Sequence, residues 1–197
     1  MAAADYGELA TLREMLGIQE SDTSRDGLLS LALTTASRSI DKSTGRRFWL
    51  DPVPVTRTYR LAGRIVREQD GDALLVDDIG GADIVVATGT TGSWSTVTTY
   101  DALPDNAIAD GRPITSLLLT GGWGLESGRV QVTTRFGWPE VPADIDMAAH
   151  LLAARLYKRK DSPEGVTGSA EWGVVRLSRR DPDVWNLIEQ YVLPGIG

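Results

Sequence analysis

A series of short strand-like runs between residues 55 and 138 constrains the fold more than any other feature of this sequence. The runs are rich in β-branched residues, and turn pairs such as Asp70-Gly71 and Gly80-Gly81 separate them. They cover residues 55–61, 73–76, 84–88, 96–100, 116–119 and 129–136. About eighty residues of this kind are enough for a small sandwich or barrel, so the sequence predicts one β-rich unit here.

Amphipathic helix patterns flank this β-rich segment on both sides. The N-terminal patterns are Leu9, Leu12, Met15 and Leu16, and then Leu28, Leu29, Ala32, Ala36 and Ile40. Because helices lie on both sides, the β-rich segment is an insertion rather than a separate end domain. We therefore expect an α+β fold, a small bundle of about four helices with a sandwich- or barrel-like insertion between helix two and a long third helix. Residues 1–50 supply the first helices, 51–138 the insertion, and 139–197 the rest of the bundle.

The third helix and the last elements of the chain lie in residues 139–183. Pro142 suits an early helical position, and Asp144 places negative charge near the positive end of the helix dipole. The predicted buried face consists of Ile145, Ala148, Ala149, Leu152 and Leu156. The helix is expected to end near Lys160, before a loop, a strand-like run at 172–178 and a final helix. In that final helix Asp181 is the expected N-cap and Pro182 the first residue.

Three local patterns give sharper predictions. Asp5 and Glu8 have capping-box spacing at the start of the first helix, and Gly17 closes that helix. The second helix is expected to end near Gly45. The glycine-rich run of residues 121–124 lacks the lysine and the strand-to-helix setting of a phosphate loop, so we interpret it as a hairpin tip.

The side chains that carry most enzyme chemistry are missing or isolated. The chain has no cysteine and one histidine, His150, which falls within the third predicted helix and is expected to serve packing or the surface. Asp70, Asp72, Asp77 and Asp78 are a candidate calcium cluster, although their spacing differs from the twelve-residue calcium loop. We expect no catalytic site, no metal and no cofactor, and hence no enzyme. No apolar run reaches the roughly 18 residues of a membrane span, so we expect no membrane partner.

Charge is distributed unevenly along the chain, whose net charge is −7. Residues 68–111 contain nine of the 27 acidic residues and no lysine or arginine, which leaves 20 positive against 18 negative residues elsewhere. Binding to DNA phosphates requires lysine and arginine, so the central segment is expected to repel DNA.

A basic cluster follows in the C-terminal part, at Arg155, Lys158, Arg159, Lys160, Arg176, Arg179 and Arg180. It is either a solvated helix end or a patch that faces an acidic partner, such as a neighbouring copy in a head-to-tail ring. The predicted partner or oligomer interface consists of Arg155, Lys158, Arg159, Trp172, Val174, Arg176, Arg179, Arg180, Trp185 and Tyr191. Within it, the run 172–178 would serve as an arm that adds a strand to a partner's sheet edge.

Several motifs resemble one protein family over essentially the whole chain. They are MLGI at 15–18, RRF at 46–48, LVDDIG at 75–80, GRPI at 111–114, RFGWPEVPAD at 135–144, AARLYKRKDSPEGV at 153–166 and VRLSRRDPDV at 175–184. Together they resemble the head–tail connector, or head-to-tail adaptor, proteins of long-tailed bacteriophages, particularly those of actinobacterial hosts. The motifs are structural rather than catalytic.

The resemblance implies a structural virion protein. Such connectors form a ring, typically of twelve copies, that docks beneath the portal protein, prolongs the channel for double-stranded DNA without sequence-specific binding, and carries the stopper or tail-completion proteins. It implies synthesis in the host cytoplasm and a final place in the neck at the portal vertex. The smallest connectors lack the β insertion, whose role is therefore not inherited from them.

An alternative function of another class rests on the tryptophans. Four of the six lie between Trp49 and Trp138 and would suit a carbohydrate- or receptor-binding β module with a helical oligomerisation part. Scattered tryptophans more often fill cores and interfaces, and that interpretation is favoured here.

Overall fold

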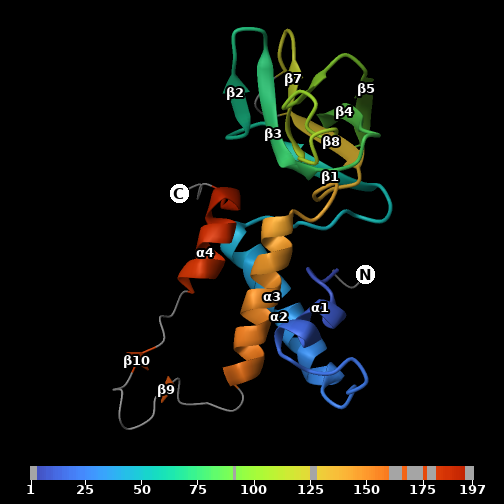
Figure 1. Ribbon diagram of the computed structural model, residues 1–197. Coiled ribbons are helices and arrows are strands. Elements are labelled where there is room, and N and C mark those ends of the chain that lie inside the picture. The colour runs from blue at the N-terminus through green and yellow to red at the C-terminus, as the bar shows by residue number, and fades with distance from the viewer. Residues whose placement is uncertain are drawn as a thin grey trace. The chain divides into compact units, whose positions relative to one another are not determined.

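The computed structural model describes residues 4–90, 92–124, 128–159, 166–167, 175–176 and 181–193. The chain divides into a helical unit, Met1–Arg46 with Val141–Gly197, and a β unit, Arg47–Glu140 (Figure 1). Within the described residues, the protein has four α-helices, two four-stranded antiparallel sheets and one two-stranded sheet. The predicted α+β class, with a β-rich insertion between the second and third helices, is confirmed.

The helical unit is built from four helices and a short strand pair. The helices are α1 (Leu9–Met15), α2 (Asp26–Thr44), α3 (Ala143–Arg159) and α4 (Pro182–Ile188), followed by the 3-10 helix η1 (Glu189–Tyr191). Strands β9 (Val166–Thr167) and β10 (Val175–Arg176) pair antiparallel with each other. α2 and α3 pack against each other, α1 contacts both, and α4 packs on α3.

The ends of the helices follow local chemistry only in part. α2 ends at Gly45, which has φ +70°, as predicted. Asp181 caps α4 by accepting hydrogen bonds from the backbone N–H groups of Asp183 and Val184, also as predicted. The prediction of a capping box at Asp5 is wrong, because α1 begins after Glu8 without a side-chain cap. The Asp5 carboxylate instead accepts a hydrogen bond from the Thr34 hydroxyl at 2.7 Å, a partner distant in sequence.

The buried faces of α2 and α3 differ from the predicted ones at a few positions. The periodicity places Leu28 on the inner face of α2, but its side chain is 53% exposed. On α3, Leu152 and Leu156 are only half-buried, whereas Ala153 and Tyr157 are buried. The buried residues of α3 are therefore three alanines together with Ile145, His150 and Tyr157, and the small alanines allow close approach to α2 within the same chain.

The β unit consists of two four-stranded antiparallel sheets. One sheet has the order β1 (Val55–Arg60), β8 (Arg129–Thr134), β4 (Val85–Thr90), β5 (Ser93–Val97). The other has the order β2 (Ile65–Arg67), β3 (Asp72–Ile79), β7 (Ile114–Leu119), β6 (Asp101–Leu103). Both contribute to one core, which includes Leu74, Leu117, Val86, Val132 and Phe136. A bridge between Ile79 and Phe136 links the two sheets.

Strand prediction is good for the central strands and for the edge strand β1, and poor for the other three edge strands, β2, β5 and β6. The sequence does not predict strands β2 and β6, and the predicted run at 96–100 lies too late, since β5 ends at Val97. The prediction of a hairpin tip at residues 121–124 is wrong. β7 and β8 belong to different sheets, and the glycines lie on the connection that crosses from one sheet to the other. Trp123 in this crossing is buried, and its indole N–H donates to the Asp72 carbonyl at 2.8 Å.

Part of the acidic segment is neutralised by arginines that precede it in sequence. Asp77 accepts a hydrogen bond from Arg57 at 2.7 Å and lies 3.8 Å from Arg64. The Tyr59 hydroxyl donates to the same carboxylate at 3.2 Å, and burial, followed by the charge of Asp77, raises the pKa of this phenol. The charge separation seen along the sequence is therefore smaller in space.

Candidate assembly interface

The predicted interface begins at the C-terminal end of α3, where Arg155 has a partner inside the chain. Its Nη1 lies 2.6 Å from Asp181 Oδ2, and each of the two side chains is 23% exposed. Because Asp181 also caps α4, this ion pair ties the end of α3 to the start of α4. Lys158 and Arg159, in the last turn of α3, are exposed and give this end of the helix its positive surface.

Tyr191 and Trp185 of the predicted interface also lie close to the bundle. The Tyr191 hydroxyl donates to Asp144 Oδ2 at 3.3 Å, and its carbonyl accepts from Arg46 Nε at 2.8 Å. These bonds join the end of the chain to the start of α3 and the end of α2. Trp185, on α4, is half-buried.

The remaining predicted interface residues lie in the connection between α3 and α4. Trp172, Val174, Arg179 and Arg180 lie outside the described residues. Arg176 belongs to β10, where it is paired in register with Val166 of β9. The role of this segment as an arm stays a prediction.

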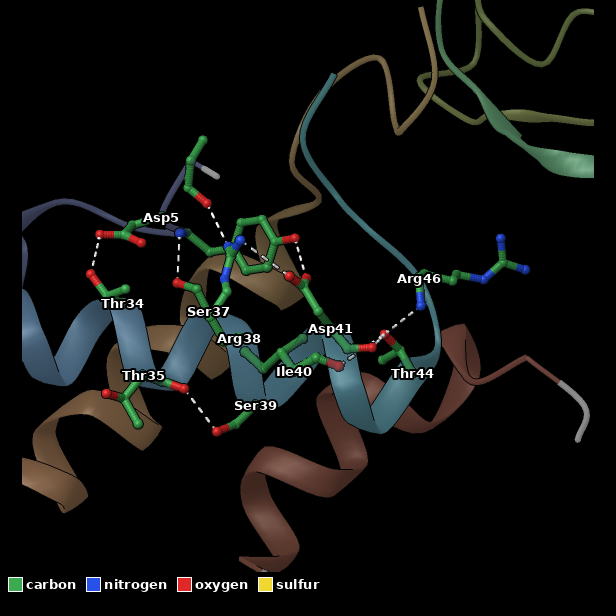
Figure 2. A network of polar contacts seen from close by, with 12 residues as sticks. Asp5, Thr34, Thr35, Ser37, Arg38, Ser39, Ile40, Asp41, Thr44 and Arg46 are labelled. Carbon is green, nitrogen blue, oxygen red and sulfur yellow. Dashed lines mark hydrogen bonds and ion pairs between the residues drawn. The ribbon is translucent and has the colours of Figure 1, made fainter. Parts of the chain in front are cut away.

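A polar cluster fixes the N-terminal segment onto one flank of α2 (Figure 2). The buried Ser37 hydroxyl accepts from the Tyr6 backbone N–H at 2.8 Å and donates to the Leu33 carbonyl at 2.8 Å. Arg38 donates to the Ala4 carbonyl at 2.6 Å. The Tyr6 hydroxyl donates to Asp41, and its ring is fully buried. The first described residues therefore act as part of the bundle and cover this flank of α2.

His150 holds the same segment from α3. It is 2% exposed, and its Nε2 accepts from the Glu8 backbone N–H at 3.1 Å, while Nδ1 lies 2.9 Å from the Asp146 carbonyl oxygen. A β-carbon on Gly7 would lie 2.7 Å from Nε2, so the backbone passes directly against the imidazole ring. Of the two expected roles of His150, packing or the surface, its burial shows packing.

Replacing Ser37 with alanine is expected to destabilise the helical unit by about 1–3 kcal/mol, because the buried Tyr6 N–H loses its acceptor. Ser39→Ala is the matched control on the same helix. The Ser39 hydroxyl donates only to the Thr35 carbonyl of its own helix, so its loss should change stability by less than about 0.5 kcal/mol. Urea denaturation followed by far-ultraviolet circular dichroism measures both. Equal effects of the two substitutions would show that the Ser37 contact is not needed.

Two outward-facing stripes on α2 and α3 are not recognised from the sequence. The outer α2 stripe consists of Leu28, Leu31, Thr35 and Lys42, all exposed, and the outer α3 stripe of Met147, Leu151, Ala154 and Lys158. Leu31 is 63% exposed and Met147 47%. The residues of each stripe are three, four or seven positions apart, the spacing of one helix face. The sequence shows this spacing, but it does not show which apolar face of each helix is buried.

Other candidate chemistry finds little support in the described part of the chain. No group of three or more histidine and acidic side chains there could hold a metal ion, so the calcium cluster is not formed by these residues. Asp78 instead accepts from the Trp138 indole N–H at 3.0 Å. The helices that the structure describes include none long and apolar enough to cross a membrane.

The fold has a counterpart among solved structures. No family model matches the sequence, and no curated protein matches it. A chain from the neck of an empty GTA (gene transfer agent) particle, computed with C6 symmetry, aligns over 100% of this chain and 98% of its own, with a TM-score of 0.57 and 19% identity. A chain from the neck of a native GTA particle, computed with C12 symmetry, has the same coverage, 20% identity and a TM-score of 0.44. The first similarity shows a common fold across both units.

Proposed function

We propose that this chain is a structural protein of the neck of a phage-like particle, where it forms a ring between the portal and the tail. The observation that carries the proposal is the fold shared with a chain of a GTA neck over 100% of this chain and 98% of that one. The sequence motifs that resemble head–tail connectors of long-tailed phages support it independently, since they span both units. The proposed partners are the portal protein on one side and stopper or tail-completion proteins on the other.

The proposed ring is defined by its copy number and by the contact between neighbouring copies. The neck that contains the similar chain was computed with C6 symmetry. We propose twelve copies, a number that six-fold symmetry accommodates. A ring requires a heterologous contact, in which two different surfaces of each copy meet. The exposed Lys158 and Arg159 are proposed to belong to one of these surfaces.

In the proposed ring, double-stranded DNA passes through the lumen without sequence-specific contacts. Several acidic side chains of the β unit are exposed, among them Glu68, Asp70, Asp83, Asp101, Asp105 and Asp110. Exposed carboxylates repel phosphates and so oppose adhesion of the β unit to DNA. The protein would thus act by shape and position in the virion neck rather than by catalysis.

A carbohydrate-binding β module fits the structure less well. A sugar platform needs exposed aromatic faces, yet Trp123 and Trp138 are 5% and 8% exposed and donate hydrogen bonds inside the β unit. Trp94 and Trp49 are half-buried, and the guanidinium of Arg47 stacks 4.0 Å from the ring centroid of Trp49. These tryptophans serve the packing of the β unit.

Ring formation is the decisive experiment. The purified full-length protein, alone and mixed with the portal protein of the same particle, is expected to give ring-shaped assemblies with a central opening in electron micrographs. The portal is included because a template can be required for closure. Portal alone is the control, and the mixed sample should show an additional ring of density on it. If neither sample contains the protein in rings, the proposed function is wrong.

A further inference from the structure

The outer stripes of α2 and α3 lie on opposite sides of the helix pair. The two helices lie side by side and pack against each other (Figure 1). Their buried residues include Leu29 and Ala36 of α2 and Ala149 and Ala153 of α3. Each outer stripe lies on the side of its helix away from these residues. A surface on one side and a different surface on the other are what head-to-tail association requires.

We propose that the outer α2 stripe of one copy packs against the outer α3 stripe of the next copy. This inference rests on the proposed ring and specifies its subunit contact. Leu28 and Leu31 are 53% and 63% exposed, and Met147 is 47% exposed, so the single chain leaves apolar surface on both stripes in water. Helix-to-helix contact between copies buries these side chains, which provides the driving force for closure.

The middle of the outer α2 stripe is suited to contact with another helix. The Thr35 hydroxyl donates to the Leu31 carbonyl at 2.7 Å, and Figure 2 shows Thr35 on the side of α2 away from Asp5. Because the hydroxyl is satisfied within its own helix, its burial leaves no unpaired donor. The N-terminal segment covers a different flank, at Thr34, Ser37 and Arg38, and leaves this stripe open.

The geometry of a ring sets the register of this contact. In a ring whose axis runs along the helix pair, rotation about that axis moves a residue around the ring without changing its height along the axis. Residues of α2 and α3 that lie side by side in one chain are then at the same height in neighbouring copies. Within one chain, Arg25 at the start of α2 donates to the Tyr157 hydroxyl near the end of α3 at 3.2 Å, which shows that the helices run antiparallel. Leu31 lies six residues after Arg25 and Leu151 six residues before Tyr157, so these two positions are level.

Charges at both ends of the stripes are complementary in this register. The basic end of α3, with Lys158, meets the loop before α2, where Glu20 and Asp22 are exposed. Hydrogen bonds from the hydroxyl and the backbone N–H of Ser24 lower the pKa of Asp22. At the other end, Lys42 of α2 lies close to the level at which α3 starts, where Asp144 is an acidic residue of the first turn and also accepts hydrogen bonds from Gln190 and Tyr191 of its own chain. A flipped contact would place Lys42 against Lys158, so charge favours the head-to-tail arrangement.

Thiol cross-linking tests the contact directly, because the natural chain has no cysteine. The full-length Leu31→Cys/Leu151→Cys variant, assembled as in the ring experiment and treated with a short bismaleimide, is expected to give a ladder of covalent multimers on a denaturing gel. Its highest rung would report the copy number of the ring. The control is Ser30→Cys/Leu151→Cys, in which the first cysteine is exposed on another face of α2 and should yield monomer.

The outcomes separate this inference from the proposed function. If both variants form rings but the Leu31 variant gives no more multimers than the control, the α2–α3 contact is wrong and the ring stands. If neither the natural chain nor the variants enter rings with the portal, the proposed function fails and the contact fails with it. As a second measurement, Leu28→Ser/Leu31→Ser should abolish ring formation, whereas Met15→Ser, at an exposed residue of α1, should not. Retained rings in the double serine variant would also overturn the contact.

Discussion

Replacing Phe136 with alanine is expected to lower the free energy of unfolding of the β unit by about 3–5 kcal/mol. The ring is 0% exposed, belongs to the core shared by both sheets, and has the Arg57 guanidinium 4.0 Å above its centroid. Its truncation would leave a cavity at the bridge to Ile79, where the two sheets are linked. Urea denaturation followed by tryptophan fluorescence measures the effect.

Val85→Ala is the matched control for Phe136→Ala. Val85 also lies in the β unit, on β4, but its side chain is 58% exposed. Its truncation removes little buried surface, so the free energy of unfolding should change by less than about 0.5 kcal/mol. A loss of less than about 1 kcal/mol for Phe136→Ala would mean that the two sheets do not share one cooperative core.

Gly137→Ala is expected to destabilise the β unit by about 3 kcal/mol or more, from backbone strain and overlap together. Gly137 has φ +110°, and an added β-carbon would overlap the Trp49 carbonyl oxygen and lie 2.8 Å from its carbonyl carbon. Both neighbours are backbone atoms held in place, since the Asp51 N–H donates to the Phe136 carbonyl at 2.8 Å and the Gly137 N–H to the Asp78 carbonyl at 2.7 Å. The same denaturation experiment provides the value.

Gly27→Ala is the control for the effect of a glycine-to-alanine exchange at a position without strain or overlap. Gly27 lies within α2 and has no positive φ, and apart from its chain neighbours and the adjacent backbone of its own helix no atom lies within 4 Å of the place that an added β-carbon would take. Alanine there should stabilise the helix by about 0.5–1 kcal/mol, the usual difference between the two residues in a helix. If Gly137→Ala were as well tolerated as Gly27→Ala, the close backbone approach at Trp49 would not exist in solution.

The fold class and most helix ends are predictable because they depend on neighbours in sequence. The cap at Asp181 and the stop at Gly45 each involve groups within a few residues, so local patterns suffice. Strands β2 and β6 are three residues each and lie at sheet edges, where too few residues repeat to give a pattern. The crossing at residues 121–124 resembles a hairpin tip in sequence because glycines mark a turn without revealing which strands it joins.

The candidate interface is predictable in its charge but not in its surfaces. The sequence indicates a basic end of α3, and Lys158 and Arg159 are exposed there. It does not show that Arg155 pairs with Asp181, because the two residues are 26 positions apart and separated by a strand pair. Nor does it show the outer stripes, since Leu28 and Leu29 are equally apolar and only packing decides which one is buried.

The sequence by itself determined the order of helical and β-rich segments, the positions of most helices, and the absence of cysteine chemistry, because periodicity and composition are properties of the chain alone. Tertiary structure decided which arginine neutralises Asp77, which serine holds Tyr6, and which leucine of α2 faces water. Each of these depends on residues that are distant in sequence and adjacent only after folding. Burial and ion pairing depend on contacts between segments that are distant in sequence, and a single sequence does not show which segments are in contact.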